Sequence, residues 1–250
     1  MKKSIKKWQI IALSLFLFTI SCNSDDDKPD IDPIEGKKDI LIGTFLQNNS
    51  GNIGASYMQL ISGIDSKSVD NKQAIPTTSP SFVIGDEIYS LPGWTGTSNI
   101  CKKYKIKNGA IIEQAVMQLP AGSGANGIAV NSEKIYIAYS FLGKIGVYDR
   151  NSFKHLKDID IKSYGIGDQN PDPAHMIIRE DILYVALNQI VGSNHVPDPA
   201  RAAVDVLLID TKVDEIKKMI TEDSSGMSMP TKPDANRNAI FMDENQDIYI

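Results

Sequence analysis

The sequence predicts an all-β protein built from repeated four-stranded antiparallel sheets. Between Ala125 and Asp160, apolar or aromatic side chains occupy alternate positions in short runs, as in strands that bury one face. Turn residues separate the runs, which predicts strands at about Asn126–Val130, Lys134–Ser140, Lys144–Asp149 and Phe153–Ile161. Four such strands form one blade of a β-propeller. A single blade cannot bury both faces of its sheet, so further copies are expected beside it.

Similar second strands recur along the chain, each with a tyrosine after an apolar residue and a polar turn before them. The tyrosines are Tyr89, Tyr136, Tyr184 and Tyr249, spaced by 47, 48 and 65 residues. The two shorter spacings are blade-sized. The prediction for residues 39–250 is therefore a β-propeller of about four blades plus a fragment. The first blade begins at its second strand, with strands at Asp39–Leu46 and Ser56–Ile61 and a weaker one near Ser66–Val69.

The ring predicted from this sequence is incomplete. The sequence stops at Ile250, inside the second strand of the fifth unit. Three whole blades, an incomplete first blade and a fragment do not close a ring, and both ends would expose unpaired strand edges. We therefore expect a truncated product or a fragment of a seven- or eight-bladed protein.

The first 21 residues have the pattern of a signal peptide. Four lysines precede Ile10–Ile20, an uncharged, mostly apolar run too short to span a membrane comfortably. Ser21-Cys22 then resembles a bacterial lipobox, although Thr19 stands where leucine is usual. The resemblance implies that Cys22 is lipidated and becomes the mature N-terminus. The alternative is an ordinary secretory signal followed by an incidental cysteine.

Residues 22–38 read as a flexible tether, rich in proline and charge. The run from Ser24 to Asp27 resembles the acidic export signal of surface lipoproteins of the Bacteroidetes type. That resemblance implies a lipid-anchored protein of the outer membrane, exposed at the cell surface. An anchor that faces the periplasm is the alternative.

The balance of charges excludes some partners. The chain has 26 basic and 31 acidic residues, and its formal charge of −5 becomes about −9 once the four signal lysines are removed. An acidic mature chain argues against nucleic acid as a partner. With Cys22 lipidated, Cys101 has no cysteine partner, so neither a disulfide framework nor a thiolate metal site is expected. No cofactor motif is present, so no cofactor is expected.

Antiparallel order assigns the connections to two faces of the propeller. Turns between strands 1–2 and 3–4 are short, whereas the long segments join strands 2–3 or successive blades. We call the side with the long segments the long-loop face, and it is the expected binding face. Its segments are Gln47–Gly54, Asn71–Pro80, Leu91–Ser98, Pro120–Ala125, Ser163–Pro173, Gln189–Ala202 and Thr221–Arg237.

Several residues of the long-loop face are candidates for ligand binding. Trp94 is either an anchor for its own loop or a surface on which a ligand stacks. His195 and Arg201 lie in the long insertion of the fourth unit, where simple loop polarity is the alternative. Phe141 flanks a tight loop and Lys144 follows that loop.

His175 is the candidate for the central channel, because it opens a first strand. Pro173-Ala174-His175, followed by Leu183–Asn188, resembles the YVTN/lactonase-like propellers, with one extra residue before Asn188. In that superfamily a histidine at the channel mouth often follows a proline. A structural histidine that caps the strand is the alternative.

Taken together, the lipidated tether, the acidic signal and the YVTN-like blades resemble an uncharacterised family of Bacteroidetes surface-lipoprotein propellers. Some members capture ferric siderophores and pass them to a TonB-dependent receptor. The resemblance implies ligand capture without chemistry, with the candidates Trp94, Phe141, Lys144, His175, His195 and Arg201. Lactone hydrolysis around His175 is an alternative, although no second catalytic residue is apparent. A protein-interaction module is the third possibility.

Overall fold

The computed structural model describes residues 39–47, 53–62, 73–75, 80–93, 98–108, 110–191, 196–197, 204–222 and 240–249. All of them belong to one compact unit, Asp39–Ile250. They form β-strands, turns and two short 3-10 helices, so the all-β prediction is confirmed. Within these ranges, no helix has the length and apolar character that a membrane span requires.

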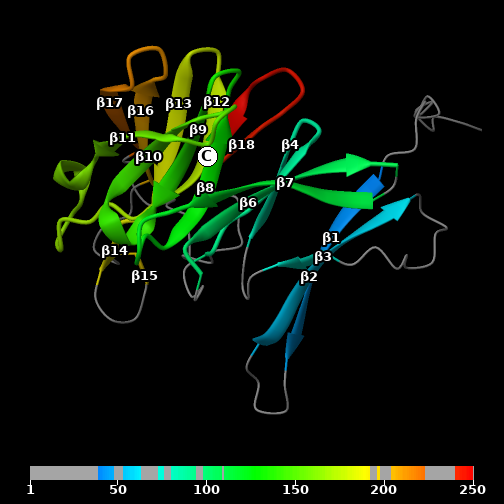
Figure 1. Ribbon diagram of the computed structural model, residues 1–250. Coiled ribbons are helices and arrows are strands. Elements are labelled where there is room, and N and C mark those ends of the chain that lie inside the picture. Colours follow the sequence, from blue (N-terminus) through cyan, green and yellow to red (C-terminus); the bar gives the residue numbers. More distant parts are fainter. Residues whose placement is uncertain are drawn as a thin grey trace, which may run out of the picture. The chain divides into compact units, whose positions relative to one another are not determined.

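The three complete blades are four-stranded antiparallel sheets in chain order, and we number the blades 1 to 5 along the chain (Figure 1). Blade 2 contains β4 (Ser81–Ile84), β5 (Glu87–Ser90), β6 (Ile100–Lys107) and β7 (Ala110–Gln118). Blade 3 contains β8 (Ala125–Val130), β9 (Lys134–Tyr139), β10 (Lys144–Asp149) and β11 (His155–Asp160). Blade 4 contains β12 (Pro173–Arg179), β13 (Ile182–Leu187), β16 (Val204–Asp210) and β17 (Glu215–Glu222).

Short elements occupy three of the connections. Helix η1 (Ser140–Leu142) joins β9 to β10, and η2 (Lys162–Tyr164) follows β11. The hairpin of β14 (Ile190–Val191) and β15 (Val196–Pro197) is inserted between β13 and β16. All three connections belong to the long-loop face.

Blades 1 and 5 have fewer strands among the described residues. Blade 1 is β1 (Asp39–Gln47), β2 (Ile53–Ser62) and β3 (Gln73–Ile75), and blade 5 is β18 (Phe241–Met242) paired with β19 (Ile248–Tyr249). The strand expected near Ser66–Val69 lies outside the described residues, and the strand that pairs with β2 on the side away from β1 is β3. β3 is short and buries only one apolar side chain, that of Ile75, so its alternation is too weak to recognise.

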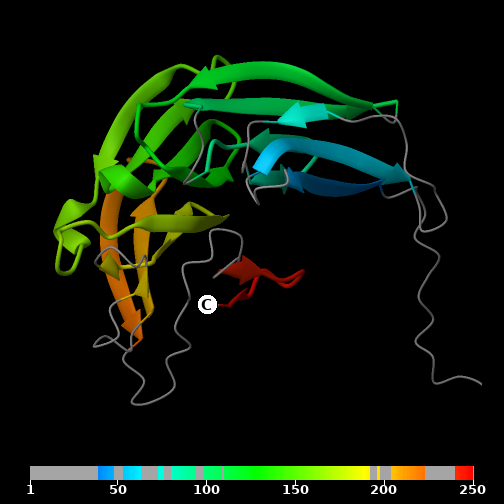
Figure 2. The ribbon, with the colours of Figure 1, turned by 90° about the horizontal axis from the view of Figure 1, so that it is seen from below.

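The apolar core lies between neighbouring blades, and we call each of these packed contacts a joint. In joint 1–2, Met58, Leu60 and Ile75 of blade 1 pack with Ile88, Tyr104 and Ile111 of blade 2. Separate clusters fill joints 2–3, 3–4 and 4–5. The succession of blades can be followed by colour in Figure 2. The recurring tyrosine of strand 2 belongs to the joint with the next blade in each case described: Tyr89, Tyr136 and Tyr184.

Local sequence chemistry forms the short turns between strands 1 and 2. Gly85 turns blade 2 with a φ of 62°, in the left-handed region that favours glycine. In blade 3, Asn131 Oδ1 accepts hydrogen bonds from the backbone N–H groups of Glu133 (2.9 Å) and Lys134 (2.7 Å). Asp243 does the same in blade 5, accepting from Asn245 and Asp247. These Asx-type bonds fix the register of the strands that follow.

Candidate functional site

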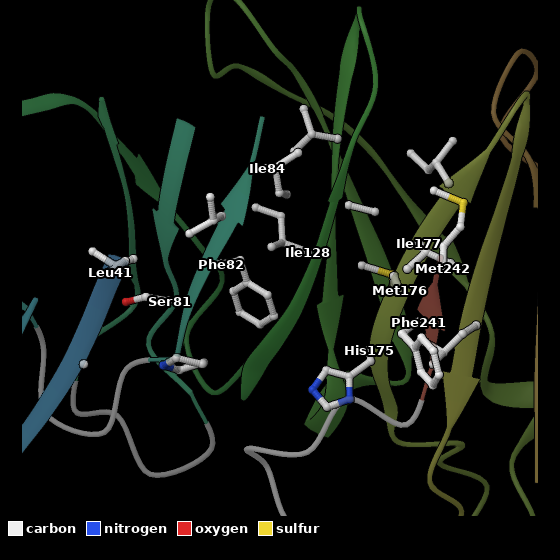
Figure 3. Close-up of a pocket in the computed structure, with 17 residues that line it drawn as sticks. Leu41, Ser81, Phe82, Ile84, Ile128, His175, Met176, Ile177, Phe241 and Met242 are labelled. Atoms are coloured by element: carbon white, nitrogen blue, oxygen red, sulfur yellow. The ribbon is translucent and has the colours of Figure 1, made fainter. Parts of the chain in front are cut away.

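A cavity of about 850 Å³ lies among the innermost strands of the five blades. Its wall comes from β1, β4, β8, β12 and β18, and Figure 3 shows Phe82, Ile128 and His175 directed into it from three different strands. The lining residues are Leu41, Gly43, Pro80, Ser81, Phe82, Val83, Ile84, Ile128, Ala129, Val130, His175, Met176, Ile177, Ile178, Ile240, Phe241 and Met242.

The wall is almost entirely apolar. Of the lining residues within the described ranges, only Ser81 and His175 have polar side chains, and none carries a carboxylate or a permanent positive charge. Ser81 Oγ is buried without a hydrogen-bond partner among the described residues. A volume of this size and an apolar wall with a few polar groups are typical of small-molecule sites.

His175 lies near the start of β12, at the end of the cavity toward the long-loop face. The pairing of β12 with β13 shifts between Pro173 and Met176, so the ladder is irregular where His175 sits. The side chain is buried, and burial lowers the pKa of His175 below its ordinary value. The imidazole is therefore neutral at neutral pH, and it can donate or accept a hydrogen bond but supplies no positive charge.

A polar network on the long-loop face holds the segment before His175 in place. Ser140 Oγ donates to the carbonyl oxygen of Pro173 (2.5 Å), which ties helix η1 to the start of β12. Asn170 Nδ2 donates to the Ser140 carbonyl (2.8 Å) and to Asp172 Oδ1 (2.9 Å). The network therefore joins blades 3 and 4 beside the end of the cavity that lies toward the long-loop face, which we call the cavity mouth.

Asp172 is the titratable group of this network. Its Oδ2 accepts a hydrogen bond from the backbone N–H of Ile190 at 2.7 Å, so the carboxyl group links the β11–β12 connection to the β14–β15 hairpin. Burial raises the pKa of Asp172 to about 7, against the opposing effect of the Ile190 hydrogen bond. Sequence reasoning missed this residue. The only sequence signal was its place in Asn170–Pro173, directly before His175.

Phe141 belongs to η1 and not to the cavity wall. Its ring is 46% exposed and covers Gly124, where an added Cβ would lie 2.7 Å from Phe141 Cδ2. Phe141 follows Ser140, the residue bound to Pro173, so it lies on the long-loop face near the start of β12. It offers a ring to a ligand outside the cavity, at the mouth.

Lys144 has an acidic partner in its own blade. Its Nζ lies 3.2 Å from Asp158 Oδ2, and Asp158 Oδ1 lies 2.8 Å from His155 Nε2. Asp158 belongs to β11, the outermost strand of blade 3. The structure therefore places Lys144 away from the cavity wall, and it does not bring Lys144 together with His175.

The remaining predicted site residues, Cys22, Trp94, His195 and Arg201, lie outside the described residues. Across the part of the chain that the structure describes, no group of three or more His, Cys, Asp or Glu side chains is arranged to hold a metal ion. His175 is the only titratable side chain in the described wall. The described arrangement is an apolar cavity that can exclude water from a bound molecule, with one neutral imidazole in its wall.

Comparisons with known proteins support the fold. Protein-family models give no match to this chain, and neither do curated proteins. Among solved structures, a functionally unknown protein from Desulfotomaculum acetoxidans is 13% identical, with a TM-score of 0.54 over 82% of this chain and 59% of its own. Hydrazine synthase from Kuenenia stuttgartiensis is 16% identical, with a TM-score of 0.49 over 66% of this chain and 43% of its own.

AztD from Citrobacter koseri is 12% identical, with a TM-score of 0.41 over 68% of this chain and 44% of its own. The chain therefore spans about half the length of these structures. At such identities the likeness concerns the fold alone, and only the first of the three has a TM-score above 0.5. The repeated four-stranded blades and the likeness to the Desulfotomaculum protein assign this chain to the β-propeller fold, and its described residues form three complete blades and parts of two others.

Proposed function

We propose that this protein captures a small ligand at the mouth of the cavity and releases it unchanged. The observation that carries the proposal is the cavity itself, of about 850 Å³, whose described wall is mainly apolar and has one titratable side chain. A hydrolytic site requires several acid–base or electrophilic groups that converge on one point. The described wall offers His175 alone for that purpose, which favours binding over catalysis.

The second part of the proposal concerns location. A lipid on Cys22 and the acidic tether of residues 22–38 would hold the propeller at the outer membrane, facing the cell exterior. A TonB-dependent receptor is the proposed partner that takes over the ligand. These statements rest on the resemblances of the N-terminal sequence.

The ligand class to test first is a ferric siderophore. A ferric catecholate is bulky, flat-faced and anionic, so it would use aromatic rings for stacking and cations for charge. Phe141 supplies an exposed ring beside the mouth. Trp94, His195 and Arg201, which the sequence assigns to the long-loop face, are the further proposed partners, and Arg201 supplies a positive charge.

Trp94 provides the test. The sequence has two tryptophans, and Trp8 lies in the expected signal segment, so Trp94 is the only tryptophan of residues 22–250. Titration with a ferric catecholate siderophore should quench its fluorescence saturably, and Arg201→Ala should weaken the binding by about tenfold. Lys107→Ala, at the end of β6 opposite the long-loop face, is the matched control. The absence of saturable quenching would reject siderophore capture.

A further inference from the structure

The chemistry of the described cavity wall indicates what can enter the cavity. We propose that the cavity receives an uncharged, mainly apolar molecule or an uncharged part of a larger ligand, bound between β4, β8, β12 and β18. The proposal rests on ligand capture as the function and specifies the ligand class for the inner part of the same site.

The first argument is electrostatic. An ion that leaves water for an apolar cavity loses favourable hydration, and only an opposite charge or several hydrogen bonds can replace it. Among the described lining residues there is no lysine or arginine, and Ser81 and His175 have the only polar side chains. An anionic chelate therefore has no partner for its charge inside the cavity.

The second argument is the exposed apolar surface in the wall. Val83, Phe241 and Met242 are lining residues, and all three leave much of their side chains exposed. Phe241 also stacks on Tyr249, with ring centroids 4.9 Å apart and planes 11° from parallel. Apolar surface gathered around a concavity is typical of a site that a ligand covers.

The third argument concerns the polar atoms that such a ligand would carry. The strands β4, β8 and β12 are each the first strand of their sheet, with only one neighbour in that sheet. The open edge of a strand presents backbone N–H and C=O groups. These neutral groups, together with the imidazole of His175, suit carbonyl, hydroxyl or amide groups on an uncharged ligand.

Val83 allows a test that spares the core, because it is 58% exposed and still lines the cavity. The probes are Nile red, which is neutral, and 1-anilinonaphthalene-8-sulfonate, which is anionic, both added to the mature full-length chain. We expect saturable one-to-one binding of Nile red, changed less than about twofold between roughly 0.05 and 0.5 M salt. The anionic probe should bind at least about tenfold more weakly.

Charge placed in the wall should change this preference. Val83→Asp should weaken Nile red binding by about tenfold, and Val83→Lys should weaken it similarly while strengthening the binding of the anionic probe. Val116 is the matched control, since it is 50% exposed on β7 and is not a lining residue. Val116→Asp and Val116→Lys should leave both probes unaffected.

Three results would overturn the inference. One is that the unaltered protein binds the anionic probe more strongly than Nile red, with a steep dependence on salt. Another is equal loss of Nile red binding in the Val83 and Val116 variants. The third is light scattering that shows a dimer whose formation excludes Nile red, because a second copy would then occupy the site.

The failure of this inference can be distinguished from failure of the proposed function. Quenching of Trp94 by a ferric catecholate with no binding of Nile red would leave siderophore capture intact and reject the uncharged cavity ligand. Nile red binding without any quenching by the chelate would support the cavity ligand and reject the siderophore.

Discussion

Glu87 and Arg150 form an ion pair across joint 2–3, with Glu87 Oε2 and Arg150 Nη2 3.2 Å apart. The same carboxylate lies 2.6 Å from Lys103 Nζ and accepts a hydrogen bond from Tyr89 Oη at 2.6 Å. The next joint has the same arrangement with the charges exchanged. There, Lys134 is the first residue of strand 2 of blade 3. Its Nζ lies 2.9 Å from each carboxylate oxygen of Asp214 in blade 4.

Removal of the charge of Glu87 should destabilise the protein. Glu87→Gln leaves Lys103 and Arg150 without their anion, and Lys103 is buried. We expect a loss of about 3 kcal/mol in the free energy of unfolding, measured by urea denaturation at pH 7. Asp86→Asn, next in the chain, removes an exposed pair with Lys105 and should leave the stability nearly unchanged, because water screens such pairs. Equal effects of the two substitutions would contradict the role of Glu87 in the joint.

Asp172 should make stability depend on pH. Burial raises its pKa in the folded protein to about 7, above the ordinary value of 3.8, so the folded state keeps a proton that the unfolded chain releases. Stability conferred by this group is therefore complete below about pH 4 and is lost as the pH rises toward 7.

Between pH 5 and 8, the free energy of unfolding should fall by roughly 3 kcal/mol less in Asp172→Asn than in the unaltered protein, because the amide stays neutral throughout. Urea midpoints at pH 5, 6, 7 and 8 would measure it, and Glu133→Gln, at an exposed turn position, is the control. An unchanged slope in the Asp172 variant would show that other groups cause the pH dependence.

Gly127 allows the inner strands of blades 3 and 4 to approach closely. A Cβ at this position would lie 1.8 Å from the carbonyl oxygen of Ala174 in β12. Gly127→Ala should therefore force β8 and β12 apart and lower the free energy of unfolding by about 3 kcal/mol. Gly43→Ala, in the wall at β1, meets no atom within 4 Å and should be tolerated. Thermal unfolding of both variants would compare them, and two equally stable proteins would refute the close contact.

Cys101 should be unreactive in the folded protein. Its thiol is fully buried in joint 2–3, and burial raises its pKa to about 12, so almost no thiolate is present at pH 8. A disulfide reagent should modify it only after urea unfolding. Ser132→Cys, at an exposed turn, should react at once in the same assay. Rapid modification of native Cys101 would mean that joint 2–3 opens readily.

The repeating part of the fold was predictable because its signals are local. Alternation and turn chemistry placed Tyr89, Tyr136 and Tyr184 correctly on their strands, within sheets of the expected order. The short third strand of blade 1 was not predicted, because its single buried apolar side chain, Ile75, gives no alternation to recognise.

The candidate site was predictable only in part. His175 lies in the wall of the central cavity, at the expected start of a first strand. The partner of Lys144 was not foreseen, since Asp158 approaches it only through the pairing of β10 with β11. The role of Asp172 depends on Ile190, 18 residues away in another connection, and no local pattern encodes that bond.

The division of the core into joints has a consequence for how the molecule can change. Each cluster of buried side chains is shared by two neighbouring blades, and the richest described cluster fills joint 3–4. Amide hydrogens of β9, β10 and β13 should therefore exchange last, and those of β1, β3 and β19 first. A destabilising substitution in one blade should therefore disturb the packing mainly in the two joints that this blade shares with its neighbours. The long loops of a blade can accordingly diverge in sequence and acquire new specificities while blades two positions away keep their packing.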